Sequence, residues 1–197
     1  MKVIAVLNQK GGSGKTTTAA ALAGALREKH FVACLDLDPQ ACLGLLTTGV
    51  DNVDPSNVGQ VLRTLAGQDF VIIDTPPALG PAVRVASELA DGIVIPTRAT
   101  LLDMRGLANL LQVIDTSKII GLVVIAYRGH VRHHRRVLER LEGLGFPIVS
   151  RIPFTISVAD AGLLGQSVTT YSAAKSRGAA AAYFELSEGI ERWAKTG

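Results

Sequence analysis

The sequence predicts a three-layer, doubly wound α/β fold, with a mostly parallel sheet and helices on both faces. Short apolar runs alternate along the chain with longer helical patterns, and the runs are nearly continuous rather than alternately apolar and polar. Strands that are buried on both faces of a parallel sheet have this pattern. The right-handed crossovers that join such strands place helices on both sides of the sheet.

The expected elements follow in order along the chain. Runs rich in valine and isoleucine predict strands over 3–7, 31–35, 70–73, 92–95, 119–126 and 147–152. Helices are expected over 16–29, 58–66, 81–89, 102–115, 131–144 and 176–194. Segment 16–26 is small or apolar on all sides, which indicates a central, buried helix. Segment 51–56 is polar and is expected to be a loop.

Composition limits the class of protein. The chain has 197 residues, 48% of them hydrophobic, and a formal net charge of +3. These values predict a single domain over 1–197 with a sizeable core, and they exclude a disordered chain. Two cysteines are too few for a disulfide scaffold. We see no transmembrane segment and no signal peptide, so a cytoplasmic protein with reduced thiols is expected.

A glycine-rich loop follows the first expected strand and leads into the first expected helix. It has most of the phosphate-loop pattern of nucleoside triphosphatases, except that Gln9 stands where that pattern begins with glycine. Its glycines let backbone N–H groups approach phosphates, Lys15 supplies a charge for the β- and γ-phosphates, and the Thr16 hydroxyl can bind Mg²⁺. The expected nucleotide-binding residues are Gly11, Gly12, Ser13, Gly14, Lys15, Thr16 and Thr17. The alternative is a strand–helix turn that binds nothing.

Carboxylates stand at the ends of two expected strands. Asp36 and Asp38 follow the second strand, and Asp74 follows the third. Ligands bind at the carboxyl ends of strands in such sheets, so these side chains should face the phosphate loop. Hydrolysis of a phosphoanhydride needs Mg²⁺ and a group that orients the attacking water. The alternative role for each aspartate is to cap a helix.

These motifs resemble the ParA/MinD family of deviant Walker-motif ATPases. Lys10 matches the family's early signature lysine, and Leu-Asp-Leu-Asp-Pro-Gln and Ile-Ile-Asp-Thr-Pro-Pro follow in order. The resemblance covers essentially the whole chain and implies a P-loop NTPase fold. It also implies an ATPase with ATP and Mg²⁺ as cofactors, in which Asp36 and Asp74 join Thr16 around the metal and Asp38 positions the attacking water. Because the chain starts at the first strand, it resembles the short ParA type, without an N-terminal helix-turn-helix.

The resemblance implies a cycle of assembly and release. ATP drives a sandwich homodimer in which Lys10 reaches the nucleotide of the other subunit, and the dimer binds DNA without sequence preference. A ParB-like or other cargo-adaptor protein stimulates slow hydrolysis and releases the dimer. Such a protein would associate with the nucleoid and partition a plasmid, a chromosome or another large cargo.

Basic residues are concentrated late in the chain. The segment 128–142 holds five arginines and two glutamates, and arginines at helical spacing predict one exposed stripe. The candidate DNA-binding residues are Arg128, Arg132, Arg136, Arg140, Arg151, Lys175 and Arg177. Arg177 matches a position tied to DNA binding in the family. The alternative is an ordinary solvated face, partly paired with Glu139 and Glu142.

Other functions remain as alternatives. A MinD-like, membrane-bound switch would need a basic amphipathic helix at its end, whereas segment 183–193 carries three glutamates and one arginine. No membrane partner is therefore expected. A metabolic ATP-dependent ligase of the dethiobiotin synthetase kind uses a similar loop, but the Lys10 signature and the Asp-Pro-Gln string argue against it.

Overall fold

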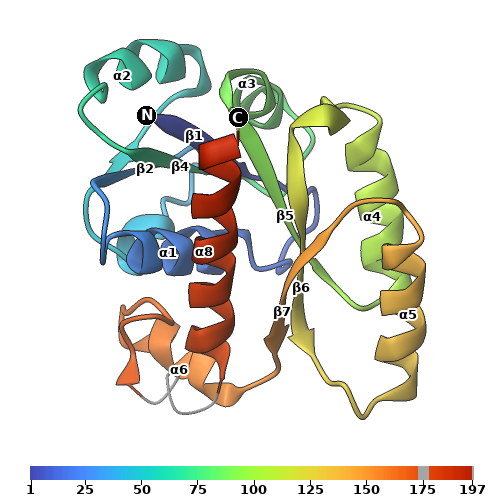
Figure 1. Cartoon of the computed structure of the whole chain (residues 1–197). Helices are drawn as coiled ribbons and strands as arrows, with labels where there is room; N and C mark the ends of the chain where they lie inside the picture. The colour runs from blue at the N-terminus through green and yellow to red at the C-terminus, as the bar shows by residue number, and fades with distance from the viewer. Residues whose placement is uncertain (173–177, 197) are drawn as a thin grey trace.

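The computed structural model describes residues 1–172 and 178–196, and a seven-stranded sheet forms its centre (Figure 1). The strands are β1 (Lys2–Val6), β2 (Val32–Asp36), β3 (Val50–Asn52), β4 (Phe70–Asp74), β5 (Gly92–Arg98), β6 (Ile119–Tyr127) and β7 (Ile148–Pro153). Their order is β3-β2-β4-β1-β5-β6-β7, and each neighbouring pair runs parallel. The strand order reverses at β1, as in a doubly wound sheet. The predicted fold class is therefore confirmed.

Helices cover both faces of the sheet. They are α1 (Lys15–Leu26), α2 (Val58–Thr64), α3 (Pro81–Leu89), α4 (Leu101–Leu111), α5 (Arg132–Glu142), α6 (Ile156–Leu163) and α8 (Ala179–Thr196). Short 3-10 turns lie at η1 (Leu43–Leu45), η2 (Pro55–Asn57) and η3 (Thr116–Lys118). Successive β1 side chains point to opposite faces: Ala5 packs in the core under α2–α5, and Ile4 packs in the core under α1 and α8.

Segment 183–193, in which the membrane alternative required a basic face, lies within α8. Its apolar residues Tyr183, Leu186 and Ile190 are buried in the core shared with α1. Figure 1 shows α8 lying beside α1 along one side of the sheet. Across residues 1–172 and 178–196, no helix combines the length and the apolar character that crossing a bilayer requires.

The structure departs from the sequence prediction in several places. The edge strand β3 lies partly in a segment that we expected to be a loop, and α6 was not predicted at all. Two of the three β3 residues are exposed and polar, and both Ile156 and Leu163 of α6 are exposed, so neither element has the pattern of a buried one. Predicted helices 16–29 and 102–115 end earlier, at Leu26 and Leu111. The start of predicted helix 176–194 lies outside the described residues.

Candidate nucleotide-binding site

The candidate site lies where the strand order reverses, at the carboxyl ends of the central strands. β1 leads into the glycine-rich loop and pairs with β4 on one side and β5 on the other. Val6 and Asp36 both stand opposite Asp74 in the register. The parallel pairing therefore brings the phosphate loop and two of the predicted carboxylates to the same edge of the sheet.

The loop adopts a backbone that requires glycine. Gly12 and Gly14 have φ of 69° and 84°, in the left-handed region. A Cβ on Gly14 would also lie 2.6 Å from Cδ1 of Ile125. Gly14 caps α1 without a side-chain hydrogen bond, and the buried Ser13 hydroxyl has no hydrogen-bond partner within the described chain. The helix end and this hydroxyl fit an anion such as a phosphate, which accepts hydrogen bonds.

Lys15 lies under this loop rather than in solvent. It is 6% exposed, and its Nζ donates a hydrogen bond to the Lys10 carbonyl over 3.3 Å. Burial lowers the pKa of Lys15, while the nearby carboxylates of Asp74 and Asp38 oppose that shift. The ammonium group is thus preorganised, and added negative charge beside it would favour its protonated form.

Asp74 is a buried carboxylate at the end of β4. Its Oδ1 accepts a hydrogen bond from the Thr75 amide over 3.0 Å, and Oδ2 has no partner among the described residues. Burial raises the pKa of Asp74 to about 7, although the Thr16 hydroxyl opposes the rise. A cation at this position would stabilise the ionised form and use the free oxygen. The Asp74 and Thr16 oxygens therefore fit Mg²⁺, which prefers oxygen ligands.

Asp36 holds the segment that follows β2. Its two carboxylate oxygens accept hydrogen bonds from the backbone amides of Asp38 and Leu43, each over 2.9 Å. Burial raises its pKa, and these two hydrogen bonds oppose the rise. Asp38 is half-buried, and its Oδ1 accepts from the Gln40 amide over 3.0 Å. Asp36 thus fixes the backbone that carries Asp38.

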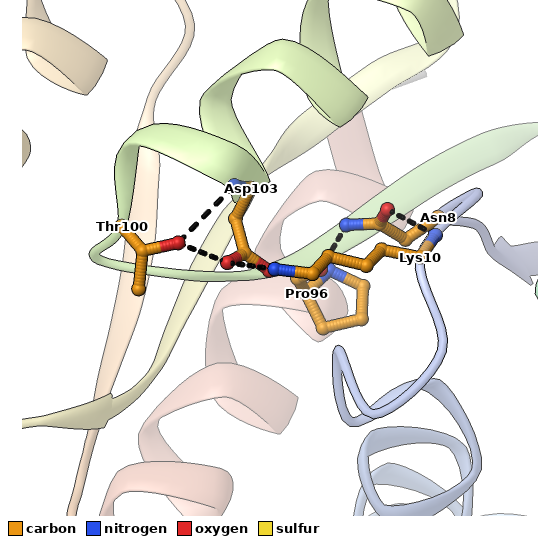
Figure 2. Close-up of polar contacts among 5 residues, drawn as sticks. All are labelled: Asn8, Lys10, Pro96, Thr100 and Asp103. Atoms are coloured by element: carbon orange, nitrogen blue, oxygen red, sulfur yellow. Dashed lines mark hydrogen bonds and ion pairs between the residues drawn. The ribbon is translucent and has the colours of Figure 1, made fainter.

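Lys10 extends from the loop towards α4 (Figure 2). Its Nζ lies 2.6 Å from Oδ2 of Asp103, whose side chain is fully buried, while that of Lys10 is 36% exposed. The Thr100 hydroxyl hydrogen-bonds the same carboxylate and caps α4. Asn8 anchors the start of the loop, because its Oδ1 accepts a hydrogen bond from the Lys10 amide and its Nδ2 donates one to the Pro96 carbonyl. Sequence reasoning missed Asp103 and Asn8; Thr100 with a carboxylate three residues later was the available signal, since this spacing caps helices.

A cavity of about 450 Å³ borders the loop at Gly12, Gly14 and Thr17. This volume lies within the usual range of about 300–1,000 Å³ for small-molecule sites. Its far wall comes from β6, β7, the β7–α6 connection, α6 and α8, through Ile125, Ala126, Ile152, Pro153, Phe154, Thr155, Val158, Ala159, Gly162 and Tyr183. Arg98, which sequence reasoning also missed, completes the lining.

The predicted basic stripe is exposed on α5. Arg132, Arg136 and Arg140 are all exposed, while Val137, Leu138 and Leu141 form the buried face. Leu144 lies beyond the end of the helix and is 42% exposed, so it is not part of that buried face.

The other predicted basic residues are dispersed. Arg151 forms an ion pair with Glu142, with Nη2 and Oε1 3.0 Å apart. The Arg128 guanidinium stacks 3.8 Å from the ring centre of Phe154 at the cavity. Lys175 and Arg177 lie outside the described residues.

Comparison with known proteins identifies the family. Residues 4–168 match the model of the CobQ/CobB/MinD/ParA nucleotide binding domain. The chain belongs to this family. The predicted resemblance to ParA/MinD ATPases is confirmed, and with it ATP hydrolysis as the family's activity and ATP with Mg²⁺ as its cofactors.

The relatives differ in how much of the chain they match. The maintenance of carboxysome distribution protein A of Gloeobacter kilaueensis is 42% identical over an alignment of 112 residues, and the match covers 52% of this chain and 52% of that protein. The match thus spans about half the length of that relative. The chromosome-partitioning ATPase Soj of Thermus thermophilus is 29% identical, with 95% of this chain and 94% of Soj covered. Cobyrinic acid a,c-diamide synthase of Mycobacterium smegmatis, with bound ADP and magnesium, has a TM-score of 0.80 and 25% identity, covering 100% of this chain and 96% of that one.

Proposed function

We propose that this chain, as one domain over residues 1–197, is an ATP-driven switch that positions a large cargo on DNA. ATP binding forms a sandwich homodimer that binds DNA without sequence preference. An adaptor protein then stimulates slow hydrolysis and releases the dimer. The observation that carries the proposal is the meeting of the phosphate loop, Lys10 and the strand-end carboxylates at one edge of the sheet.

The loop residues 11–17 bind the phosphates. Left-handed glycines, a helix end without a side-chain cap and a Ser13 hydroxyl that has no partner among the described residues support this role. Lys15 contributes its charge at the β- and γ-phosphates. The neighbouring cavity has room for the nucleoside, and its largely apolar wall suits a base.

Thr16, Asp36 and Asp74 hold the magnesium ion, which neutralises charge on the phosphates when bound. The Oδ2 of buried Asp74, which has no partner in residues 1–172 and 178–196, supports direct or water-mediated contact. The carboxylate oxygens of Asp36 already accept hydrogen bonds from two backbone amides. Asp36 therefore contributes to the metal site through a water molecule or by holding the segment that carries Asp38. Asp38 lies on that segment and orients the attacking water.

Lys10 acts between subunits. Its side chain leaves the loop and is 36% exposed, so it can turn from Asp103 towards a second copy. In the sandwich dimer it contacts the nucleotide of the partner, which couples ATP binding to assembly. Dimerisation also doubles the exposed arginines of α5 on one particle, and this supports DNA binding that depends on ATP.

The cargo is a chromosome, a plasmid or another large body. The two relatives named for chromosome partitioning and carboxysome distribution support this class and keep both kinds of cargo open. The adaptor is a ParB-like protein or another cargo-linked protein. The switch acts in the cytoplasm, where it associates with the nucleoid. The burial of the apolar face of α8 in the core argues against that helix as a membrane anchor.

Light scattering with a hydrolysis-resistant ATP analogue tests the switch. We expect the wild type to dimerise with the analogue and remain monomeric with ADP. Lys10→Ala should bind the nucleotide yet stay monomeric, whereas Lys29→Ala, an exposed lysine of the α1–β2 connection, should behave like the wild type. Asp38→Ala should accumulate dimers with ATP itself. A Lys10→Ala protein that dimerises normally would contradict the proposed sandwich.

A metabolic ATP-dependent ligase is the second candidate. The likeness to cobyrinic acid a,c-diamide synthase favours it, because the two chains match along nearly their whole lengths. Such an enzyme would form its product without a protein partner or DNA. Lack of dimerisation in the experiment above, combined with consumption of ATP only in the presence of a small carboxylate and an amine donor, would favour this candidate instead.

A further inference from the structure

Arg98 occupies the last position of β5, beside the phosphate loop. β5 pairs with β1, the strand that leads into the loop, and Arg98 is the one exposed residue at the end of an otherwise buried strand. On its other side, β5 pairs with β6, where Arg98 stands opposite Ile125. Ile125 lies under Gly14, so the register itself places the arginine next to the loop.

The guanidinium of Arg98 lies beside Gly12 of the loop. Its Nη2 would be 3.5 Å from a Cβ placed on Gly12, which is ordinary contact distance from that position. Arg98 also lines the cavity together with Gly12, Gly14 and Thr17. No side chain at Gly12 separates the arginine from a ligand in the loop.

Two other cations near this site already have partners within the described part of the chain. Lys10 is paired with Asp103, and Arg128 is stacked on Phe154. Within residues 1–172 and 178–196, the Arg98 side chain forms no hydrogen bond and no ion pair, so its N–H donors are available. A guanidinium with available donors matches the paired oxygens of a phosphate group.

We propose that Arg98 is a further ligand of the nucleotide, which binds the phosphate chain of ATP within its own subunit. This inference rests on the proposed nucleotide function and deepens it. The charge of Lys15 and of one Mg²⁺ leaves part of the negative charge of a triphosphate unbalanced. Arg98 supplies the remaining cation in the monomer, before Lys10 of a second copy can reach the site.

The test measures binding rather than turnover, by displacement of a fluorescent ATP analogue at constant Mg²⁺. The competitors are ATP and inorganic tripolyphosphate, which carries phosphates without a base or sugar. Arg98→Gln should weaken both competitors about 10-fold or more, the usual effect of losing a charged hydrogen bond. Arg63→Gln, which removes an exposed arginine from α2, should leave both unchanged. Because Arg98 is exposed, the variant should unfold at the wild-type temperature.

The outcomes separate this inference from the proposed function. Unchanged affinity of Arg98→Gln for tripolyphosphate would overturn the assignment, whether or not ATP binding is altered. Lys15→Ala serves as the reference, and it should abolish binding of both competitors. If Lys15→Ala keeps wild-type affinity, the nucleotide site itself is wrong; if it fails to bind while Arg98→Gln binds normally, only the role of Arg98 is wrong.

Discussion

Replacing Asp103 with asparagine should release Lys10 and strengthen dimerisation with ATP. In the monomer, Lys10 Nζ and Asp103 Oδ2 are 2.6 Å apart, and the carboxylate is fully buried (Figure 2). A lysine that reaches the nucleotide of a second copy must leave this carboxylate. Asparagine keeps an oxygen for the Thr100 hydroxyl but removes the charge that holds Lys10.

The structure gives the size of the expected effect. At 2.6 Å and an effective dielectric constant of about 20, two unit charges attract each other by about 6 kcal/mol. Desolvation and solvent screening of the 36% exposed Lys10 side chain reduce this to the range of a charged hydrogen bond, about 1.5 kcal/mol. A dimer releases two such pairs, so about 3 kcal/mol opposes assembly, or about a 100-fold change in the dissociation constant.

Sedimentation equilibrium with a hydrolysis-resistant ATP analogue measures this constant. Asp103→Asn should lower it by about 100-fold, whereas Asp51→Asn, an exposed aspartate on the edge strand β3, should leave it unchanged. The reasoning is refuted if Asp103→Asn dimerises as weakly as the wild type, or more weakly, while its unfolding temperature and its affinity for the analogue stay normal.

Further predictions concern the carboxylate, the loop and the basic stripe. Asp74 ionises near its ordinary pKa of 3.8 when unfolded but at about 7 in the folded protein, so the ligand-free free energy of unfolding should fall as pH rises from 4 to 7. Urea denaturation should show Asp74→Asn to be more stable at pH 8, by about 4 kcal/mol, and to lack Mg²⁺-dependent hydrolysis; equal stability would contradict the burial argument. Gly14→Ala should lower the free energy of unfolding by about 1–2 kcal/mol and prevent binding of a fluorescent ATP analogue, because of the positive φ and the contact with Ile125; normal binding would contradict this. Replacing the α5 stripe residues Arg132, Arg136 and Arg140 by glutamate should leave nucleotide binding intact. It should reduce the salt slope of DNA binding by about 3 per subunit, whereas the exposed controls Arg63→Glu and Arg84→Glu should leave the slope unchanged. An unaltered slope in the stripe variant would show that the stripe is only a solvated face.

Much of the site could be predicted because its residues lie at the ends of strongly patterned strands. Parallel pairing puts the carboxyl ends of β1, β2 and β4 at the same edge of the sheet, independently of the loop conformations. The proximity of the phosphate loop to Asp36 and Asp74 therefore follows from the strand pattern. The glycines at positions 12 and 14 likewise allowed the loop to be predicted, since its backbone has positive φ at both positions.

The remaining parts depend on contacts between distant segments. Asp103 lies 93 positions after Lys10, and only the placement of β5 beside β1 brings the start of α4 to the loop. Arg98 reaches the loop for the same reason. The helix α6 has exposed apolar residues at both ends, so its sequence lacks an amphipathic pattern, and β3 is held by pairing with β2 rather than by burial.

DNA binding in the two nucleotide states tests the central claim most directly. Fluorescence anisotropy of a labelled duplex of arbitrary sequence can be followed against protein concentration, with Mg²⁺ and either the hydrolysis-resistant ATP analogue or ADP. The proposed switch predicts salt-sensitive binding with the analogue, little binding with ADP, and no gain from the analogue in Lys10→Ala. Equal affinity in both nucleotide states, or no binding in either, would contradict an ATP-driven DNA-binding dimer.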